Sequence, residues 1–173
     1  MNRDQGPDQK PTILVAGVGN IFLGDDGFGP EVVSHLAGEA QPLPVQAQLV
    51  DYGIRGMHLA YDLLEGYNAL LLIDARPGPG EPGELVVLEI GPGDVPGGEF
   101  DAHGMDPVAV LSALPDLGGR LPPTYLVGCR PAKLTEGIGL TPAVQNAVPA
   151  AAAAVRRLVR ELINDPHSIG ERV

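Results

Sequence analysis

The sequence predicts a single α/β domain with a twisted, mostly parallel or mixed central sheet and helices on both faces. Three observations lead to this fold class. Strand and helix signals alternate along the 173 residues, as in parallel sheets with crossover helices. Residues 69–73 are apolar throughout, which is typical of a strand buried on both faces. A glycine-rich segment, residues 17–29, joins an apolar strand to a helix.

Five short segments are rich in apolar residues and are predicted to be strands. They are residues 12–16, 45–50, 69–73, 84–90 and 124–129. The second of them is predicted to end at Asp51, and the third carries Asp74 directly after its last apolar residue.

Helices are predicted where apolar residues recur at helical spacing. They cover residues 30–36, 56–65, 106–114 and 142–163. Thr141 and Pro142 begin the longest helix, because threonine is favoured at the N-cap and proline at the first helical position. Pro149 lies inside this helix and is expected to kink it. The domain therefore spans residues 12–163, with a disordered lead over 1–11 and a flexible tail over 164–173.

Composition excludes several classes of partner. The formal net charge of −11 argues against nucleic acids and anionic membrane surfaces, because both bind through Lys and Arg. No apolar run approaches the roughly 18 residues of a membrane-spanning helix, and the first ten residues are polar. We therefore expect a cytoplasmic protein with no nucleic-acid or membrane partner. The sequence does not indicate its oligomeric state.

The glycine-rich segment does not match a nucleotide-binding loop. Gly17-Val-Gly19 opens like the dinucleotide fingerprint, but Phe22 stands where the third glycine belongs. Asp25 and Asp26 would also repel a pyrophosphate. No Gly-Lys-Ser or Gly-Lys-Thr follows, so the phosphate-binding loop of NTPases is excluded as well. One aspartate can cap the following helix, which leaves the other for different chemistry.

Acidic residues follow the first three predicted strands. Asp25 and Asp26 come after the first, Asp51 after the second and Asp74 after the third. Because ligands bind beyond the carboxyl ends of parallel strands, we expect these carboxylates to converge there. Each can also be a cap or turn residue, most simply Asp51, which is followed by Tyr52-Gly53.

His103 differs in context from His35, His58 and His167, which are interpreted as surface residues. It lies in a glycine-rich loop before the helix predicted over 106–114, so the loop can carry its ring to the same sheet edge. Two carboxylates and one imidazole can bind a divalent ion such as zinc or nickel and leave positions open for water or substrate.

Serine and cysteine nucleophiles are disfavoured. None of Ser34, Ser112 and Ser168 lies in a G-x-S-x-G turn. Cys129, the single cysteine, ends a predicted strand and is expected to be buried and inert. The H-E-x-x-H helix of common metalloproteases is also missing from the sequence. Hydrolysis by this chain would therefore need a metal ion.

Several motifs in series resemble those of the NiFe-hydrogenase maturation endopeptidases. In order, they are Gly17-Val-Gly-Asn20, Asp25-Asp-Gly-Phe-Gly29, Asp51-Tyr-Gly53, Gly56-Met57, Leu72-Ile-Asp-Ala75, the His103 loop, Leu126-Val-Gly128 and Gly139-Leu-Thr-Pro142. The resemblance spans residues 12–160. It implies an α/β protein that removes a C-terminal extension from the hydrogenase large-subunit precursor after nickel insertion.

The same resemblance implies that Asp26, Asp74 and His103 are the metal ligands. The family commonly has glutamate at the first of these positions, so Asp26 is a shorter carboxylate of the same charge. The expected ion is nickel supplied by the precursor, and zinc or another divalent ion can substitute. The ion either activates the scissile bond or reports that maturation is complete. Asp51 is a candidate for orienting water or a metal ligand.

Two other functions remain open. A nickel-binding chaperone or sensor would hold the precursor without cleaving it. A nucleotide-binding α/β enzyme would use the same sheet edge, despite the mismatched glycine motif.

Overall fold

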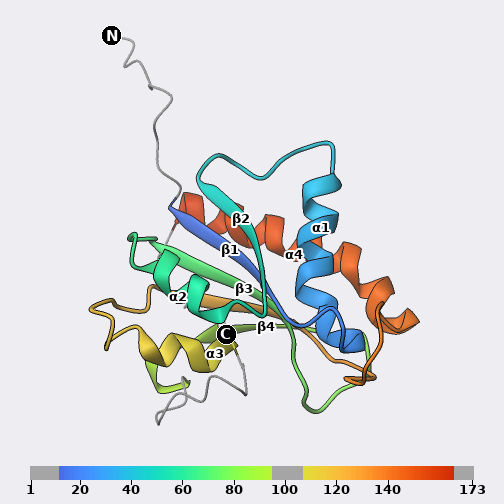
Figure 1. Ribbon diagram of the computed structural model, residues 1–173. Helices are drawn as coiled ribbons and strands as arrows, with labels where there is room; N and C mark the ends of the chain where they lie inside the picture. Colours follow the sequence, from blue (N-terminus) through green and yellow to red (C-terminus); the bar gives the residue numbers. More distant parts are fainter. Residues whose placement is uncertain (1–11, 95–106, 166–173) are drawn as a thin grey trace.

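The computed structural model describes residues 12–94 and 107–165, and it shows one five-stranded sheet flanked by helices (Figure 1). The strands are β1 (Ile13–Val18), β2 (Ala47–Gly53), β3 (Ala69–Ala75), β4 (Leu85–Ile90) and β5 (Thr124–Cys129). The α-helices are α1 (Phe28–Gly38), α2 (Gly56–Leu63), α3 (Pro107–Val110) and α4 (Pro142–Asn164). Short 3-10 turns are η1 (Gly24–Gly27), η2 (Pro92–Asp94) and η3 (Leu111–Ala113).

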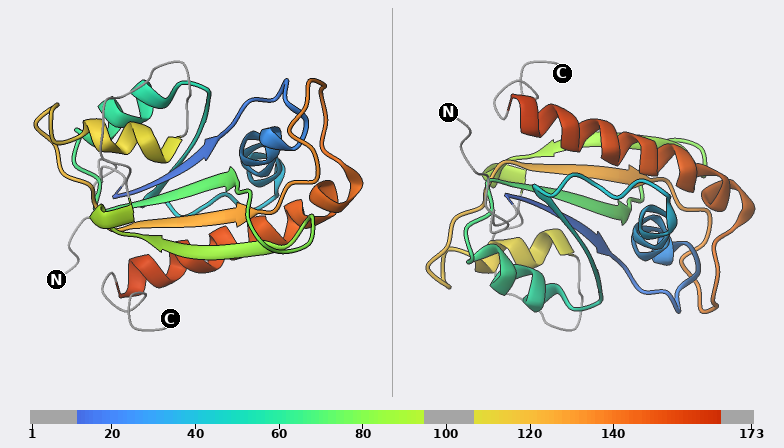
Figure 2. Two further views of the ribbon diagram at one scale, coloured as in Figure 1. Left: turned by 90° about the horizontal axis from the view of Figure 1, so that it is seen from below. Right: turned by 90° about the horizontal axis from the view of Figure 1, so that it is seen from above.

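The strands lie in the order β2-β1-β3-β5-β4. β1 pairs in parallel with β2 and β3, and β3 pairs in parallel with β5. β4 pairs antiparallel with β5, so the sheet is mixed and mostly parallel. The predicted fold class is confirmed, because helices cover both faces of this sheet (Figure 2).

Two apolar clusters hold the layers together, one on each face of the sheet. Leu71 and Ile73 of β3 pack in the cluster that α1 and α4 complete. Leu70 and Leu72 pack in the cluster that includes residues of α2, α3 and η3. Every residue of β3 is buried, which explains its uninterrupted apolar run. Burial of each leucine and isoleucine side chain of β3 stabilises the fold by roughly 1.5–3 kcal/mol.

Some boundaries differ from the prediction, and strand pairing explains most of the differences. β2 continues past Asp51 because the backbone of Asp51 pairs with Gly17, and Gly53 pairs with Val18. β3 includes Asp74, which pairs with Gly128 of β5. The helix predicted over 106–114 is the single turn α3 followed by η3. α4 extends to Asn164, one residue into the predicted tail, while residues 1–11 and 166–173 lie outside the described residues.

The start of α1 approaches the sheet closely because Gly29 has no side chain. A Cβ built on Gly29 would lie 2.3 Å from the carbonyl oxygens of both Val18 and Ile73. A Cβ on Gly17 would lie 2.4 Å from Cγ2 of Val33 in α1. This approach places η1, which precedes α1, at the carboxyl ends of β1 and β3.

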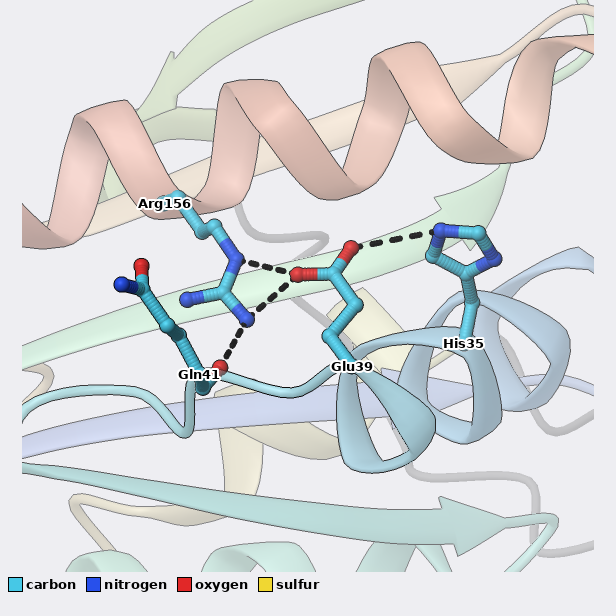
Figure 3. Close-up of polar contacts among 4 residues, drawn as sticks. All are labelled: His35, Glu39, Gln41 and Arg156. Atoms are coloured by element: carbon cyan, nitrogen blue, oxygen red, sulfur yellow. Dashed lines mark hydrogen bonds and ion pairs between the residues drawn. The ribbon is translucent and has the colours of Figure 1, made fainter.

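The other end of α1 is tied to α4 by polar contacts (Figure 3). Arg156 of α4 donates hydrogen bonds to the Glu39 carboxylate and to the carbonyl oxygen of Gln41. Nε2 of His35 lies 3.2 Å from Oε1 of Glu39. These side chains are partly exposed, so the ion pair between Arg156 and Glu39 contributes about 0–1 kcal/mol. Within the described ranges, no helix combines the length and apolar character needed to span a bilayer.

Candidate metal and substrate site

The turn η1 holds Asp26 at the carboxyl edge of the sheet. A Cβ on Gly19, whose φ is +139°, would lie 1.9 Å from the carbonyl oxygen of Asp26, so the two backbones are in direct contact. The amide of Asn20 donates a 2.8 Å hydrogen bond to Oδ2 of Asp26. Asp26 is partly exposed, and neither η1 nor α1 has a side-chain cap. The capping alternative for this aspartate pair is therefore wrong.

Asp25, the neighbour of Asp26, is fully buried and faces a segment far away in the sequence. Its carboxylate accepts hydrogen bonds from the amides of Ala132, Lys133 and Thr141, at 2.7–3.0 Å, and from the hydroxyl of Thr141. Burial opposes ionisation, but these hydrogen bonds outweigh it and hold the pKa of Asp25 below its usual range. Asp25 is therefore an ionised structural group at neutral pH.

Asp74 is the sixth of seven residues in β3 and is 6% exposed. By strand alternation its side chain lies on the same face as Leu70 and Leu72, the face that α2 and α3 cover. η1 packs against β3, so the turn that carries Asp26 and the strand end that carries Asp74 are neighbours. The structure thus brings together the two elements that supply the predicted carboxylate ligands.

His103 lies outside the described residues. α3 begins at Pro107, four residues downstream, and packs against α2 on the face that Asp74 shares. Within residues 12–94 and 107–165, no three His, Cys, Asp or Glu side chains are grouped closely enough to hold a metal ion. The predicted site depends on His103, so the three-ligand assignment stays a prediction.

Asp51 occupies a different position from Asp74. Its neighbours Val50 and Tyr52 pack on the α2 face, so its own side chain points to the opposite face. β1 separates β2 from β3, which puts the two strands roughly 10 Å apart. Oδ1 of Asp51 accepts a 2.9 Å hydrogen bond from the amide of Gly53, which is the geometry of an Asx turn. The turn interpretation of Asp51 accounts for these contacts.

An open cleft of about 290 Å³ lies beside Asp51 at the same edge of the sheet. Residues from the loop after β1 and from the end of β2 line it: Gly19, Asn20, Ile21, Phe22, Asp51, Tyr52, Gly53, Ile54 and Arg55. Phe22 is 61% exposed and Ile54 is 56% exposed. These exposed apolar residues were not predicted to belong to a site. Their position next to strand ends, in loops otherwise rich in glycine and polar residues, was the available signal.

The cysteine and the described serines differ in their surroundings. Cys129 is fully buried in the core between the sheet and α4. Burial, with a smaller contribution from the charge of Asp25, raises the pKa of the Cys129 thiol to about 11. Ser34 is an exposed residue of α1, and the hydroxyl of Ser112 donates to the carbonyl oxygen of Ala109. Ser168 lies outside the described residues.

Comparison with known proteins identifies the family. The sequence profile of the hydrogenase maturation proteases matches residues 30–158, about three quarters of the chain. The chain belongs to the hydrogenase maturation protease family. Hydrogenase 2 maturation protease of Escherichia coli is 32% identical over 152 residues, which cover 86% of this chain and 91% of that protein. The hydrogenase expression/formation protein HupD of Rhizobium leguminosarum is 32% identical over 160 residues, which cover 90% of this chain and 77% of that protein.

Solved structures agree with this assignment. The hydrogenase maturating endopeptidase HybD from Escherichia coli superposes with a TM-score of 0.72 at 33% identity. The superposition covers 86% of this chain and 92% of HybD. The chain is therefore a hydrolase of the hydrogenase maturation endopeptidase family, and it shares the fold of that family as well as its sequence pattern.

Proposed function

We propose that this maturation protease removes the C-terminal extension of a hydrogenase large-subunit precursor, and that it recognises nickel already inserted in that precursor. The observation that carries the proposal is the meeting of η1 and the end of β3 at one sheet edge. There Asp26 is partly exposed beside a strand end that carries Asp74.

The donor set suits a nickel ion presented by a substrate. Two carboxylates and an imidazole bind a divalent ion of intermediate softness, such as nickel, with moderate affinity. Three protein ligands leave coordination positions open for the precursor. Asp26 and Asp74 would supply the carboxylates, and His103 would supply the imidazole. Zinc or another divalent ion could occupy the same ligands. When bound, such an ion can polarise a carbonyl or lower the pKa of water.

Contacts within the protein fix the position of the Asp26 carboxylate at the sheet edge where the substrate would bind. The contact between Gly19 and Asp26 and the hydrogen bond from Asn20 fix the turn and the carboxylate of Asp26. The burial of Cys129 and the contacts of Ser112 support a mechanism without a serine or cysteine nucleophile. The net charge of −11 disfavours nucleic acids and anionic membrane surfaces as partners, which is compatible with a protein substrate.

The test is to incubate the purified protein with nickel-loaded and nickel-free forms of the same large-subunit precursor. Mass spectrometry then measures release of the C-terminal fragment. We expect cleavage of the nickel-loaded form only. Equal cleavage of both forms would remove the recognition role of nickel. A stable complex with the loaded precursor and no fragment would favour a chaperone or sensor.

A further inference from the structure

The loop after β1 and the segment between β5 and α4 are joined by a set of hydrogen bonds centred on Asp25, which we call the seam. Oδ2 of Asp25 accepts hydrogen bonds from the amides of Ala132 and Lys133, at 2.8 and 3.0 Å. Oδ1 accepts a 2.7 Å hydrogen bond from the amide of Thr141. The hydroxyl of Thr141 lies within 3.0 Å of both oxygens. Both oxygens of this buried carboxylate therefore accept hydrogen bonds from residues 132–141.

Main-chain hydrogen bonds extend the seam on either side of Asp25. The amide of Asp25 donates to the carbonyl oxygen of Lys133, and the amide of Gly24 donates to that of Gly137. In the other direction, the amide of Gly137 donates to the carbonyl oxygen of Phe22. Leu23 and Gly137 form an isolated parallel bridge. Gly24 and Asp25, the first two residues of η1, are thus held against residues 131–141, and Asp26 is the next residue of that turn.

We propose that Asp25 is a positioning residue, which sets the place of Asp26 by anchoring η1 to residues 131–141. This inference rests on the proposed role of Asp26 as a ligand of substrate-borne nickel. Asp25 and Asp26 are adjacent in one 3-10 turn. The hydrogen bonds of the buried Asp25 carboxylate therefore also fix the backbone position from which the Asp26 side chain extends. A displacement of about 1 Å at a reacting centre can lower the rate of a reaction by about a hundredfold.

The anchor needs a carboxylate. Its partners are all donors, and an asparagine in place of Asp25 would offer one acceptor oxygen and one amide group that faces other N–H groups. Buried amides left without an acceptor destabilise the local backbone. Asp25→Asn should therefore shift or loosen η1, although it keeps the size of the side chain.

Thr141 provides a matched pair of variants that leave Asp25 itself intact. The residue stands at the N-cap of α4, yet its side chain makes no cap hydrogen bond and donates to Asp25. Thr141→Val removes the hydroxyl but keeps the branched shape, whereas Thr141→Ser keeps the hydroxyl. A role confined to filling space predicts that valine is the better substitute. A role in anchoring Asp25 predicts that serine is.

The experiment measures three quantities for Asp25→Asn, Thr141→Val and Thr141→Ser. These are kcat/KM for nickel-loaded precursor well below the melting temperature, Kd for Ni²⁺ alone by calorimetry, and Tm. Leu162→Ala is the control for general instability, because Leu162 is buried near Thr12 and Ile13 at the amino end of β1, the edge of the sheet remote from η1.

We expect kcat/KM to fall about tenfold or more in Asp25→Asn and Thr141→Val, with weaker Ni²⁺ binding in both. Thr141→Ser should stay close to the unmodified protein. Leu162→Ala should lower Tm and leave kcat/KM unchanged. Equal losses in the valine and serine variants, or unchanged Ni²⁺ binding in all of them, would overturn the proposal.

The outcome for Asp26 separates this inference from the proposed function. If Asp26→Asn abolishes cleavage while the Asp25 and Thr141 variants lose activity only in step with Tm, the positioning role is wrong and the proposed function stands. If Asp26→Asn cleaves normally, the ligand assignment fails first, and the role of Asp25 fails with it.

Discussion

At the scale of single residues, the adjacent aspartates of η1 have contrasting environments. Asp25 points into the protein and is surrounded by hydrogen-bond donors, whereas Asp26 remains partly exposed and accepts a hydrogen bond from Asn20. Burying a charge is costly unless donors surround it, and Asp25 meets that condition. Two identical side chains in neighbouring positions can therefore have different tasks, one structural and one available for a ligand.

Replacing the predicted ligands should separate catalysis from stability. We expect Asp26→Asn, Asp74→Asn and His103→Ala each to lower cleavage of nickel-loaded precursor at least tenfold, because each removes a metal donor or its negative charge. Tm should fall little for Asp26→Asn, since its side chain is partly exposed. Cleavage rates and Tm measured on the same preparations check this expectation. Full activity in any one variant would remove that residue from the ligand set.

Cys129 should be chemically inert in the folded protein. With a thiol pKa of about 11, roughly one thiol in a thousand is ionised at pH 8, and this fraction grows tenfold for each further pH unit. Burial blocks access as well. Iodoacetamide should therefore label Cys129 slowly at pH 8 and quickly in urea, as followed by intact mass. Cys129→Ala should retain cleavage, and a catalytic thiol would give the opposite result.

At the scale of elements, the position of the site depends on how closely α1 approaches the sheet. Gly29 lies where any side chain would meet carbonyl oxygens of both β1 and β3. The helix start, and η1 before it, can therefore reach the ends of these strands only with glycine at this position. Gly29 therefore determines both how closely α1 approaches the sheet and where Asp26 lies.

Gly29→Ala should be strongly destabilising, by about 3 kcal/mol, because its methyl group would overlap backbone atoms that cannot move aside. Gly38→Ala in the last turn of the same helix is the matched control. A Cβ there meets no atom within 4 Å, so this change should be neutral or slightly stabilising. Urea unfolding of both variants measures the difference. Equal stability would contradict the close packing of α1.

Pro149 lies inside α4 and its side chain is exposed. A proline nitrogen cannot donate to the carbonyl oxygen one turn earlier, that of Gln145. We expect Pro149→Ala to raise the free energy of unfolding by roughly 1 kcal/mol through the restored hydrogen bond, and to leave cleavage unchanged. Urea unfolding measures the first effect. A decrease in stability would show that the packing of α4 requires the proline.

At the scale of the whole molecule, the sheet could be predicted because its central strands are apolar on both faces. β5 begins and ends where the sequence indicates, at Thr124 and Cys129. The extension of β2 past Asp51 was missed because backbone pairing with β1 does not depend on the side chain. The start of α4 was predicted, although the hydroxyl of Thr141 bonds to Asp25.

The seam around Asp25 could not be predicted for a similar reason. Its partners lie 107–116 residues away, and most of them are main-chain amides. Every residue except proline carries such an amide, so the sequence does not reveal which amides will bond to Asp25. The apolar pattern marked Asp25, Asp26, Asp51 and Asp74 alike, because each of them follows a predicted strand. The choice of Asp26 and Asp74 among these carboxylates rests on the family resemblance. The ligand role of His103 still rests on the family resemblance.

The position of β5 between β3 and β4 has a consequence for synthesis of the protein on the ribosome. β4 is made before β5, yet in the described part of the chain it pairs with β5 alone. A nascent chain that ends before residue 124 can assemble β2, β1 and β3, but it leaves the edge of β3 and all of β4 without partners. Such open strands promote aggregation. Products of premature termination in this region are therefore expected to become substrates of chaperones and proteases, and never partially active enzymes.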